Sequence, residues 1–221
     1  MEYLTHQILQ EEEVDQIVDK LKKDNIGWQD GKKSAGSHAA KVKNNLQLDK
    51  NSNTSLELTN KIRNILSKDL LVKSFAIPRK FHGIMFTRAS KGQSYGFHID
   101  NAYMSSGRSD LSFTLFLSKN NEYDGGELSF QTLQGSQYIK LKPGEIIIYP
   151  STSLHSVQEV KRGERLACVG WIQSYVANNE DRNNLFGLDA GARGLLAKNG
   201  RSPELDLIFQ SYSNLLRRLG D

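Results

Sequence analysis

Apolar residues recur at helical spacing in two stretches near the start of the chain. Between Glu11 and Lys23 they fall on one face of an amphipathic helix, which we expect to pack on a core: Val14, Ile17, Val18 and Leu21. A second helix is expected to start near Thr54, because Thr54 and Glu57 stand in capping-box register. Its buried face would be Leu58, Ile62, Ile65 and Leu66.

From Phe81 to Gln173 the pattern changes to short strands separated by turn residues. Between Leu111 and Leu117 apolar residues alternate with Ser112 and Thr114, which is typical of a strand with two different faces. The run from Ile146 to Tyr149 is continuously apolar and predicts a strand covered on both faces. Many short strands at this spacing predict a sandwich or jelly roll.

The chain becomes helical again over roughly its last forty residues. Ser202-Pro203-Glu204 is a plausible helix entry. Apolar positions follow at Leu205, Leu207, Ile208, Leu215, Leu216 and Leu219. This C-terminal extension either covers the β core or serves an interface, and the pattern favours neither.

Composition fits an ordinary globular protein, with 38% hydrophobic and 24% charged residues in 221. The one cysteine, Cys168, excludes an intramolecular disulfide and suits a reducing compartment. No basic segment followed by an apolar one opens the chain, and no stretch is apolar enough to span a membrane. We therefore expect a cytoplasmic location and no membrane partner.

The net charge of +4 and the pI of about 9.0 raise the question of a nucleic-acid partner. The charge is spread along the chain, however, and its densest cluster lacks interleaved aromatic residues: Lys32, Lys33, Lys41 and Lys43. This cluster is typical of a solvated loop, and its other possible role is as a substrate-facing loop. The pattern argues against nucleic-acid binding.

The strongest chemical signal is His98-Ile99-Asp100 followed by His155. Two imidazoles and one carboxylate form the facial triad that holds Fe(II) and leaves three positions open. In a strand, residues two apart share a face, so His98 and Asp100 would point into one cavity. Alone, His155 would also fit a buried core histidine. Its agreement with the His-x-Asp pair favours a metal site.

Arg165 stands ten residues after His155, where a fixed cation could hold a dicarboxylic co-substrate. The strand-like runs around His155 and Arg165 flank Lys161-Arg162-Gly163, which we interpret as the turn of a hairpin. Such a hairpin would place Arg165 close to a metal held by His155. The alternative is that Arg165 is a surface residue at a strand edge.

Several longer runs resemble the bacterial PKHD-type hydroxylases, a branch of the Fe(II)- and 2-oxoglutarate-dependent dioxygenases related to prolyl 4-hydroxylases. They include Val42-Lys43-Asn44-Asn45, Tyr95-Gly96-Phe97-His98-Ile99-Asp100, Tyr123-Asp124-Gly125-Gly126-Glu127-Leu128, Tyr149-Pro150-Ser151 and Trp171-Ile172-Gln173-Ser174. The resemblance covers nearly the whole chain. It implies a mainly β fold with flanking helices, a double-stranded β-helix of the jelly-roll, cupin-like kind. We expect an N-terminal helical part (1–75), the jelly-roll core (76–178) and a C-terminal helical extension (179–221).

The same resemblance implies the site and its chemistry. His98, Asp100 and His155 would bind Fe(II), Arg165 would bind 2-oxoglutarate, and L-ascorbate would keep the iron ferrous. Tyr95 matches a family position near the co-substrate. Strand parity, however, places a residue three before His98 on the opposite face, unless the chain bends at Gly96. Core packing is the other interpretation of Tyr95.

The implied reaction is hydroxylation with dioxygen, yielding succinate and CO2. The substrate stays open between a peptidyl residue, a free amino acid, a siderophore-like chelate and another metabolite, and family members are often associated with iron uptake. Asp100 argues against halogenation, because related halogenases replace that carboxylate. Base repair is disfavoured too, since nucleic-acid demethylases carry an Arg-x5-Arg pair and Trp171 stands six residues after Arg165.

Two alternatives from other classes remain. One is a cupin-like metal-binding or sensing protein without turnover, which would have no need of Arg165. The other is a zinc hydrolase, because two histidines and a carboxylate also bind zinc with an open position. Against the hydrolase, no obvious general base stands beside the three ligands.

Overall fold

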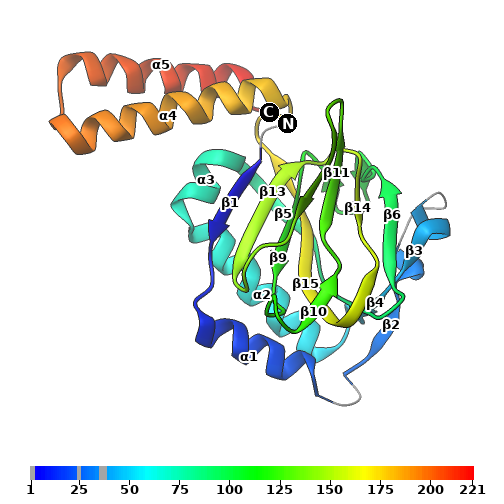
Figure 1. Ribbon diagram of the computed structural model, residues 1–221. Coiled ribbons are helices and arrows are strands. Elements are labelled where there is room, and N and C mark those ends of the chain that lie inside the picture. The colour runs from blue at the N-terminus through cyan, green and yellow to red at the C-terminus, as the bar shows by residue number, and fades with distance from the viewer. Residues whose placement is uncertain (1–2, 24–25, 35–38) are drawn as a thin grey trace.

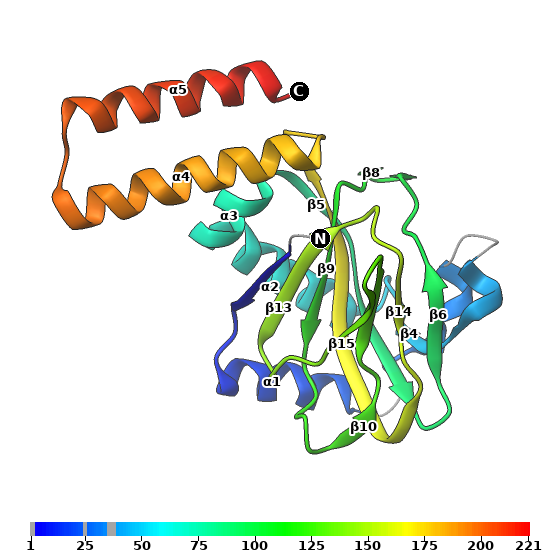
Figure 2. The same ribbon diagram turned by 45° about the horizontal axis from the view of Figure 1, so that its top comes forward.

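The structure is a computed structural model that describes residues 3–23, 26–34 and 39–221. Its centre consists of two antiparallel sheets that lie as layers in Figures 1 and 2. The larger sheet has the order β1 (Leu4–Gln7), β13 (Glu145–Pro150), β9 (Leu111–Phe116), β15 (Val160–Ser174), β5 (Pro78–Ser90), β4 (Leu46–Leu48) and β2 (Trp28–Asp30), with β10 (Tyr123–Gly125) paired to β15. The smaller sheet has the order β12 (Gly135–Ile139), β11 (Leu128–Thr132), β14 (His155–Val157), β6 (Ser94–His98) and β3 (Lys43–Asn44). A short hairpin, β7 (Tyr103–Met104) and β8 (Gly107–Arg108), follows β6.

The two faces of the larger sheet pack against different parts of the protein, and successive residues along a strand point to opposite faces. On β13, Ile146 and Ile148 belong to the large core beneath the helices, whereas Ile147 and Tyr149 pack with Phe130 of the smaller sheet. The expected strand covered on both faces is therefore confirmed. The same alternation on β9 turns Ser112 and Thr114 away from the helices, toward the interior between the sheets. This is the jelly roll that the sequence predicts.

Three helices supply the outer side of the large core: α1 (Glu11–Leu21), α2 (Asn53–Lys68) and α3 (Leu70–Ala76). The first follows the predicted range closely. The second begins before Thr54, because the hydroxyl of Ser52 already accepts a hydrogen bond from the Ser55 amide and caps the helix. The expected capping box of Thr54 and Glu57 was therefore wrong. Two short 3-10 turns, Gly31–Ser34 and Ala39–Val42, lead into β3.

The expected hairpin between the strands of His155 and Arg165 is wrong. β14 is already hydrogen-bonded on both sides, to β11 and to β6, so it has no free edge for β15. The chain instead crosses to the larger sheet, where β15 pairs with β5 and β9. Gly163 lies within β15 opposite Tyr123 and is not part of a turn between β14 and β15.

The C-terminal residues form a hairpin of α4 (Asn179–Asn199) and α5 (Pro203–Leu219), which projects to one side of the sheets (Figures 1 and 2). Its base packs on α3, where the rings of Phe75 and Phe186 meet edge to face with centroids 5.3 Å apart. Within the described residues, no helix combines the length and the apolarity that a membrane crossing requires.

Candidate metal centre

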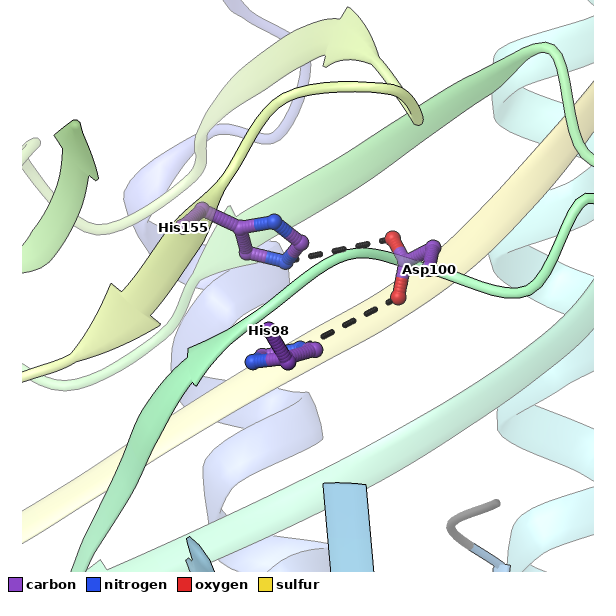
Figure 3. Close-up of side chains that lie close together, drawn as sticks. All are labelled: His98, Asp100 and His155. Carbon is purple, nitrogen blue, oxygen red and sulfur yellow. Dashed lines mark ion pairs between the residues drawn. The ribbon is translucent and has the colours of Figure 1, made fainter. Parts of the chain in front are cut away.

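His98, Asp100 and His155 converge in the interior between the two sheets (Figure 3). His98 ends β6 and His155 begins β14, and the two are direct cross-strand partners. Asp100 follows just beyond the end of β6, not within the strand as expected. One ligand atom from each residue lies within 4.8 Å of the others. The Nε2 atoms of His98 and His155 are 3.9 and 3.8 Å from the carboxylate oxygens of Asp100.

In both His98 and His155 the Nε2 atom faces the Asp100 carboxylate. The Nδ1 atoms of His98 and His155 each lie 2.9 Å from a backbone carbonyl oxygen, those of Gly96 and Ser153. A carbonyl accepts only from a protonated Nδ1, so each Nε2 keeps its lone pair for a metal. Burial, reinforced by the nearby His155, holds the pKa of His98 well below its usual value, so that the imidazole is neutral at pH 7. This donor set fits a divalent ion.

Asp100 is positioned by two serines that sequence reasoning missed. The hydroxyl of Ser112 donates to Asp100 Oδ2 at 2.5 Å and lies 2.7 Å from the hydroxyl of Ser151. Ser112 lies on the inward face of β9, and Ser151 directly follows β13. A signal was present, since Ser112 and Thr114 place hydroxyl groups on one face of a strand whose other residues are apolar. The sequence alone does not show which strands face the metal, so it could not link the Ser112 hydroxyl to Asp100.

Tyr95 lies on the metal side of β6, contrary to simple strand parity. Four residues of β6, from Tyr95 to His98, stand opposite only three of β14, from Val157 to His155, which is a β-bulge. The additional residue turns Tyr95 to the face of His98, and the two rings stack with centroids 3.6 Å apart. The irregularity considered at Gly96 thus exists as a bulge between Tyr95 and His98. Burial raises the pKa of Tyr95, so its hydroxyl keeps its proton.

Arg165 is 3% exposed and lies on β15, beside the inward-facing ring of Phe116, with 5.3 Å from Cζ to the ring centroid. Its Nε and Nη2 atoms are buried and find no hydrogen-bond partner among the described residues. Burial lowers the pKa of Arg165, while nearby Tyr123, Tyr149 and Glu127 oppose that effect. A buried guanidinium with two unused N–H groups is suited to a carboxylate ligand. The interpretation of Arg165 as a surface residue was wrong.

The Lys41 to Asn45 stretch reaches the same interior through β3, where Lys43 pairs with Tyr95. The Lys43 Nζ lies 5.0 Å from the centroid of the Tyr95 ring. Burial lowers the pKa of Lys43 to about 8, against the attraction of Asp100 and Asp30. Of the lysine cluster, Lys43 therefore lies beside the site, as the interpretation of a substrate-facing loop expects, whereas Lys32, Lys33 and Lys41 are exposed.

Comparisons with known proteins agree with this geometry. Residues 84–173 match the family model described as the 2OG-Fe(II) oxygenase superfamily. Two PKHD-type hydroxylases of Prochlorococcus marinus, from strains MIT 9211 and NATL1A, are 69% and 66% identical over 221 residues, with all of both chains covered. A Pseudomonas putida prolyl-4-hydroxylase of known structure superimposes with a TM-score of 0.52 at 18% identity, over 78% of this chain and 92% of that one. At that identity the structural likeness supports the fold alone.

Proposed function

Since the chain belongs to the PKHD-type hydroxylases, which are Fe(II)- and 2-oxoglutarate-dependent dioxygenases, we propose that His98, Asp100 and His155 bind the iron. The observation that carries this assignment is the convergence of their three ligand atoms within 4.8 Å. The backbone carbonyls at both Nδ1 atoms add support, because they leave the two Nε2 atoms free to bind metal.

Arg165 is the proposed partner of the distal carboxylate of 2-oxoglutarate. Its Nε and Nη2 atoms lie in the interior without a hydrogen-bond partner among the described residues, and a carboxylate there would accept hydrogen bonds from both. This observation favours turnover over the metal-sensing alternative, because a protein that only binds metal has no use for such a cation. The Tyr95 hydroxyl, held protonated on the same face as His98, is the proposed second contact to the co-substrate.

Bound iron with 2-oxoglutarate supplies dioxygen activation and oxidative decarboxylation, so that a substrate C–H bond is hydroxylated and succinate and CO2 are released. The protein residues contribute positioning. Ser112 fixes the Asp100 carboxylate, and the bulge holds the Tyr95 ring against His98. L-Ascorbate serves as the proposed reductant that keeps the iron ferrous between turnovers.

The proposed substrate is a peptidyl residue or a small metabolite linked to iron uptake. Lys43, buried beside Tyr95, lies where it can contact that substrate. The experiment is a screen of peptides and iron-chelating metabolites for compounds that stimulate 2-oxoglutarate consumption. A productive substrate should raise succinate formation together with an equal amount of hydroxylated product.

A substrate-independent measurement tests the assigned site. Iron-loaded protein with 2-oxoglutarate should form succinate slowly in air, and anaerobic addition of both should give the weak visible band of an iron-chelated keto acid. Ascorbate should increase the number of turnovers before inactivation. If iron-loaded protein gave neither succinate nor the band, the proposed iron and co-substrate site would be wrong.

A further inference from the structure

A cavity separate from the metal centre lies at the base of the C-terminal hairpin. Its volume is about 1200 Å³, it is open to solvent, and its lining comes mainly from α2, α3, the beginning of β5, α4 and α5. Its lining residues include neither Arg165 nor any member of the His98, Asp100 and His155 group. The volume somewhat exceeds the roughly 300–1,000 Å³ of ordinary small-molecule sites, so the cavity has room for an organic ligand.

Much of the cavity wall is apolar and part of it is accessible. Phe186 from α4 and Leu216 from α5 contribute to one side. Leu70 is 76% exposed and Tyr175 is 46% exposed, although both line the cavity. Large apolar side chains left accessible in a concave surface favour a ligand with an apolar body.

The charges around this apolar wall have one dominant sign. Five lining residues are cations, namely Arg63, Lys73, Arg79, Lys80 and Arg193. Asp189 is the one acid among the lining residues, all of which belong to the described part of the chain. Its buried carboxylate accepts hydrogen bonds from Ser74 Oγ at 2.6 Å and from Arg193 Nε at 2.8 Å. Asp189 and Arg193 neutralise each other, and the remaining charge is positive.

Two of these cations are close to each other along the chain. Lys73 stands in the last turn of α3, and Arg79 is the second residue of β5. The guanidinium of Arg79 lies over the ring of Tyr175, with 5.9 Å from Cζ to the ring centroid. Between them, Ile77 ends α3 with a φ of 43°, a left-handed conformation that is unfavourable for a β-branched residue. The cavity wall is thus built at a strained junction that places cations beside accessible apolar groups.

We propose that this cavity binds a small amphipathic organic anion, with an aliphatic or aromatic body against the apolar wall and a carboxylate near Lys73 and Arg79. Charge complementarity selects the anion, because an uncharged apolar compound would leave the cations unused. The apolar lining selects the body, because a small hydrophilic anion would leave Leu70 and Tyr175 exposed to water.

The test uses 8-anilinonaphthalene-1-sulfonate as a fluorescent anionic probe, with dodecanoate and uncharged dodecanol as competitors. Saturable binding is expected, which dodecanoate displaces and dodecanol does not. The double variant K73Q/R79Q should bind the probe about tenfold more weakly, since each partly exposed cation contributes less than one power of ten. The matched control K22Q/K23Q removes two exposed lysines beyond α1 and should bind normally.

Both double variants should fold normally, because all four replaced side chains are exposed. Circular dichroism and thermal unfolding check this. Absence of saturable binding would overturn the proposal. Equal displacement by dodecanol would do the same, and so would unchanged affinity in K73Q/R79Q. Displacement by an oligoglutamate peptide but not by dodecanoate would assign the cavity to an acidic protein segment and also overturn it. None of these measurements depends on hydroxylase activity.

Discussion

The hydroxyl of Ser112 donates a hydrogen bond to the Oδ2 atom of Asp100 at 2.5 Å, joining the larger sheet to the metal centre. The Ser112 hydroxyl is also 2.7 Å from the Ser151 hydroxyl, and both serines are almost fully buried. A hydrogen bond of this kind fixes the rotation of a ligating carboxylate before the metal arrives. The relationship makes Ser112 a positioning residue for Asp100.

Replacing Ser112 with alanine should weaken Fe(II) binding by about 10–100-fold, the range typical when such a supporting hydrogen bond is removed. Anaerobic titration with Fe(II) measures the effect directly. Ser129→Ala is the matched control, because the Ser129 hydroxyl is equally buried but has no hydrogen-bond partner in the described part of the chain. Wild-type iron affinity in Ser112→Ala would show that Ser112 does not position Asp100.

Two substitutions at Tyr95 separate the role of its ring from that of its hydroxyl. Tyr95→Phe keeps the stack on His98, so iron affinity should be unchanged while 2-oxoglutarate binds more weakly. Tyr95→Ala removes the stack as well, and should also lower the free energy of unfolding by about 1–3 kcal/mol. Metal and co-substrate titrations with chemical denaturation measure the three quantities. Equal 2-oxoglutarate affinity in Tyr95→Phe and wild type would exclude the hydroxyl as a ligand.

The His-x-Asp part of the candidate metal triad was predictable because it depends on short-range geometry. His98 and Asp100 are two residues apart, so alternation along an extended chain predicts one shared side, although Asp100 lies just beyond the end of β6. His155 was found through its residue type and the strand-like run that it begins. The spacing from His155 and then the family resemblance both pointed to Arg165, whose burial on β15 follows from the inward face of that strand.

What the sequence missed depends on pairing between distant strands. The bulge that turns Tyr95 toward His98 exists only relative to β14, which lies about sixty residues later in the chain. The false hairpin arose because His155 and Arg165 are close in sequence, whereas β14 already has a partner on each side. The hydrogen bond from Ser112 to Asp100 likewise depends on where β9 lies in the sheet relative to the triad. Such relationships are properties of the sheet order rather than of any local pattern.

Arg165→Met should weaken 2-oxoglutarate binding by about 2–5 kcal/mol, because it removes a buried cation while keeping an aliphatic side chain of similar length. Iron affinity should not change, since Arg165 is not one of the metal-binding group. Titrating 2-oxoglutarate into anaerobic iron-loaded protein, followed by the visible band, measures the difference. Arg162→Met is the control on the same strand, where the exposed guanidinium pairs with Asp124. Similar affinities of the two variants for 2-oxoglutarate would show that Arg165 does not bind the co-substrate.

His82 should make the protein less stable in mild acid. It is buried, with Nδ1 2.8 Å from Ser106 Oγ and Nε2 3.0 Å from the Arg108 carbonyl oxygen. Burial lowers the pKa of His82 below the ordinary value of 6.5, so the folded state favours the neutral ring. Its contribution is therefore complete above pH 6.5 and is lost as the pH falls from there through the lower folded-state pKa.

Denaturant unfolding of wild type and His82→Gln from about pH 7 to about pH 5 tests this sign. The free energy of unfolding should fall more steeply with acid in wild type, and the two curves should converge at low pH. The difference between the curves isolates His82, because both proteins retain the histidines of the metal centre. Parallel curves would show that His82 does not titrate differently in the folded and unfolded states.

Gly126 packs against the side chain of Arg165, and a comparison with Gly92 tests that contact. A Cβ added at Gly126 would lie 2.9 Å from Arg165 Cδ, whereas one added at Gly92 would meet nothing within 4 Å. Both glycines have positive φ, 68° and 81°, so alanine strains the backbone at each by about 1–2 kcal/mol. Gly126→Ala should lose at least as much stability as Gly92→Ala in chemical denaturation, because its added Cβ would also crowd Tyr123 and Val160, at 3.1 and 3.2 Å.

Only Gly126→Ala should also weaken 2-oxoglutarate binding, because the new methyl group pushes the Arg165 side chain from its position beside Phe116. Iron affinity should stay the same in both variants, since neither glycine contacts a metal-binding residue through the added Cβ. If both variants bound 2-oxoglutarate with equal affinity, the placement of Arg165 would not depend on Gly126, which lies in the link between β10 and β11. A selective loss in Gly126→Ala would instead show that this link positions the proposed co-substrate cation, and that its glycine is required by contact as well as by backbone conformation.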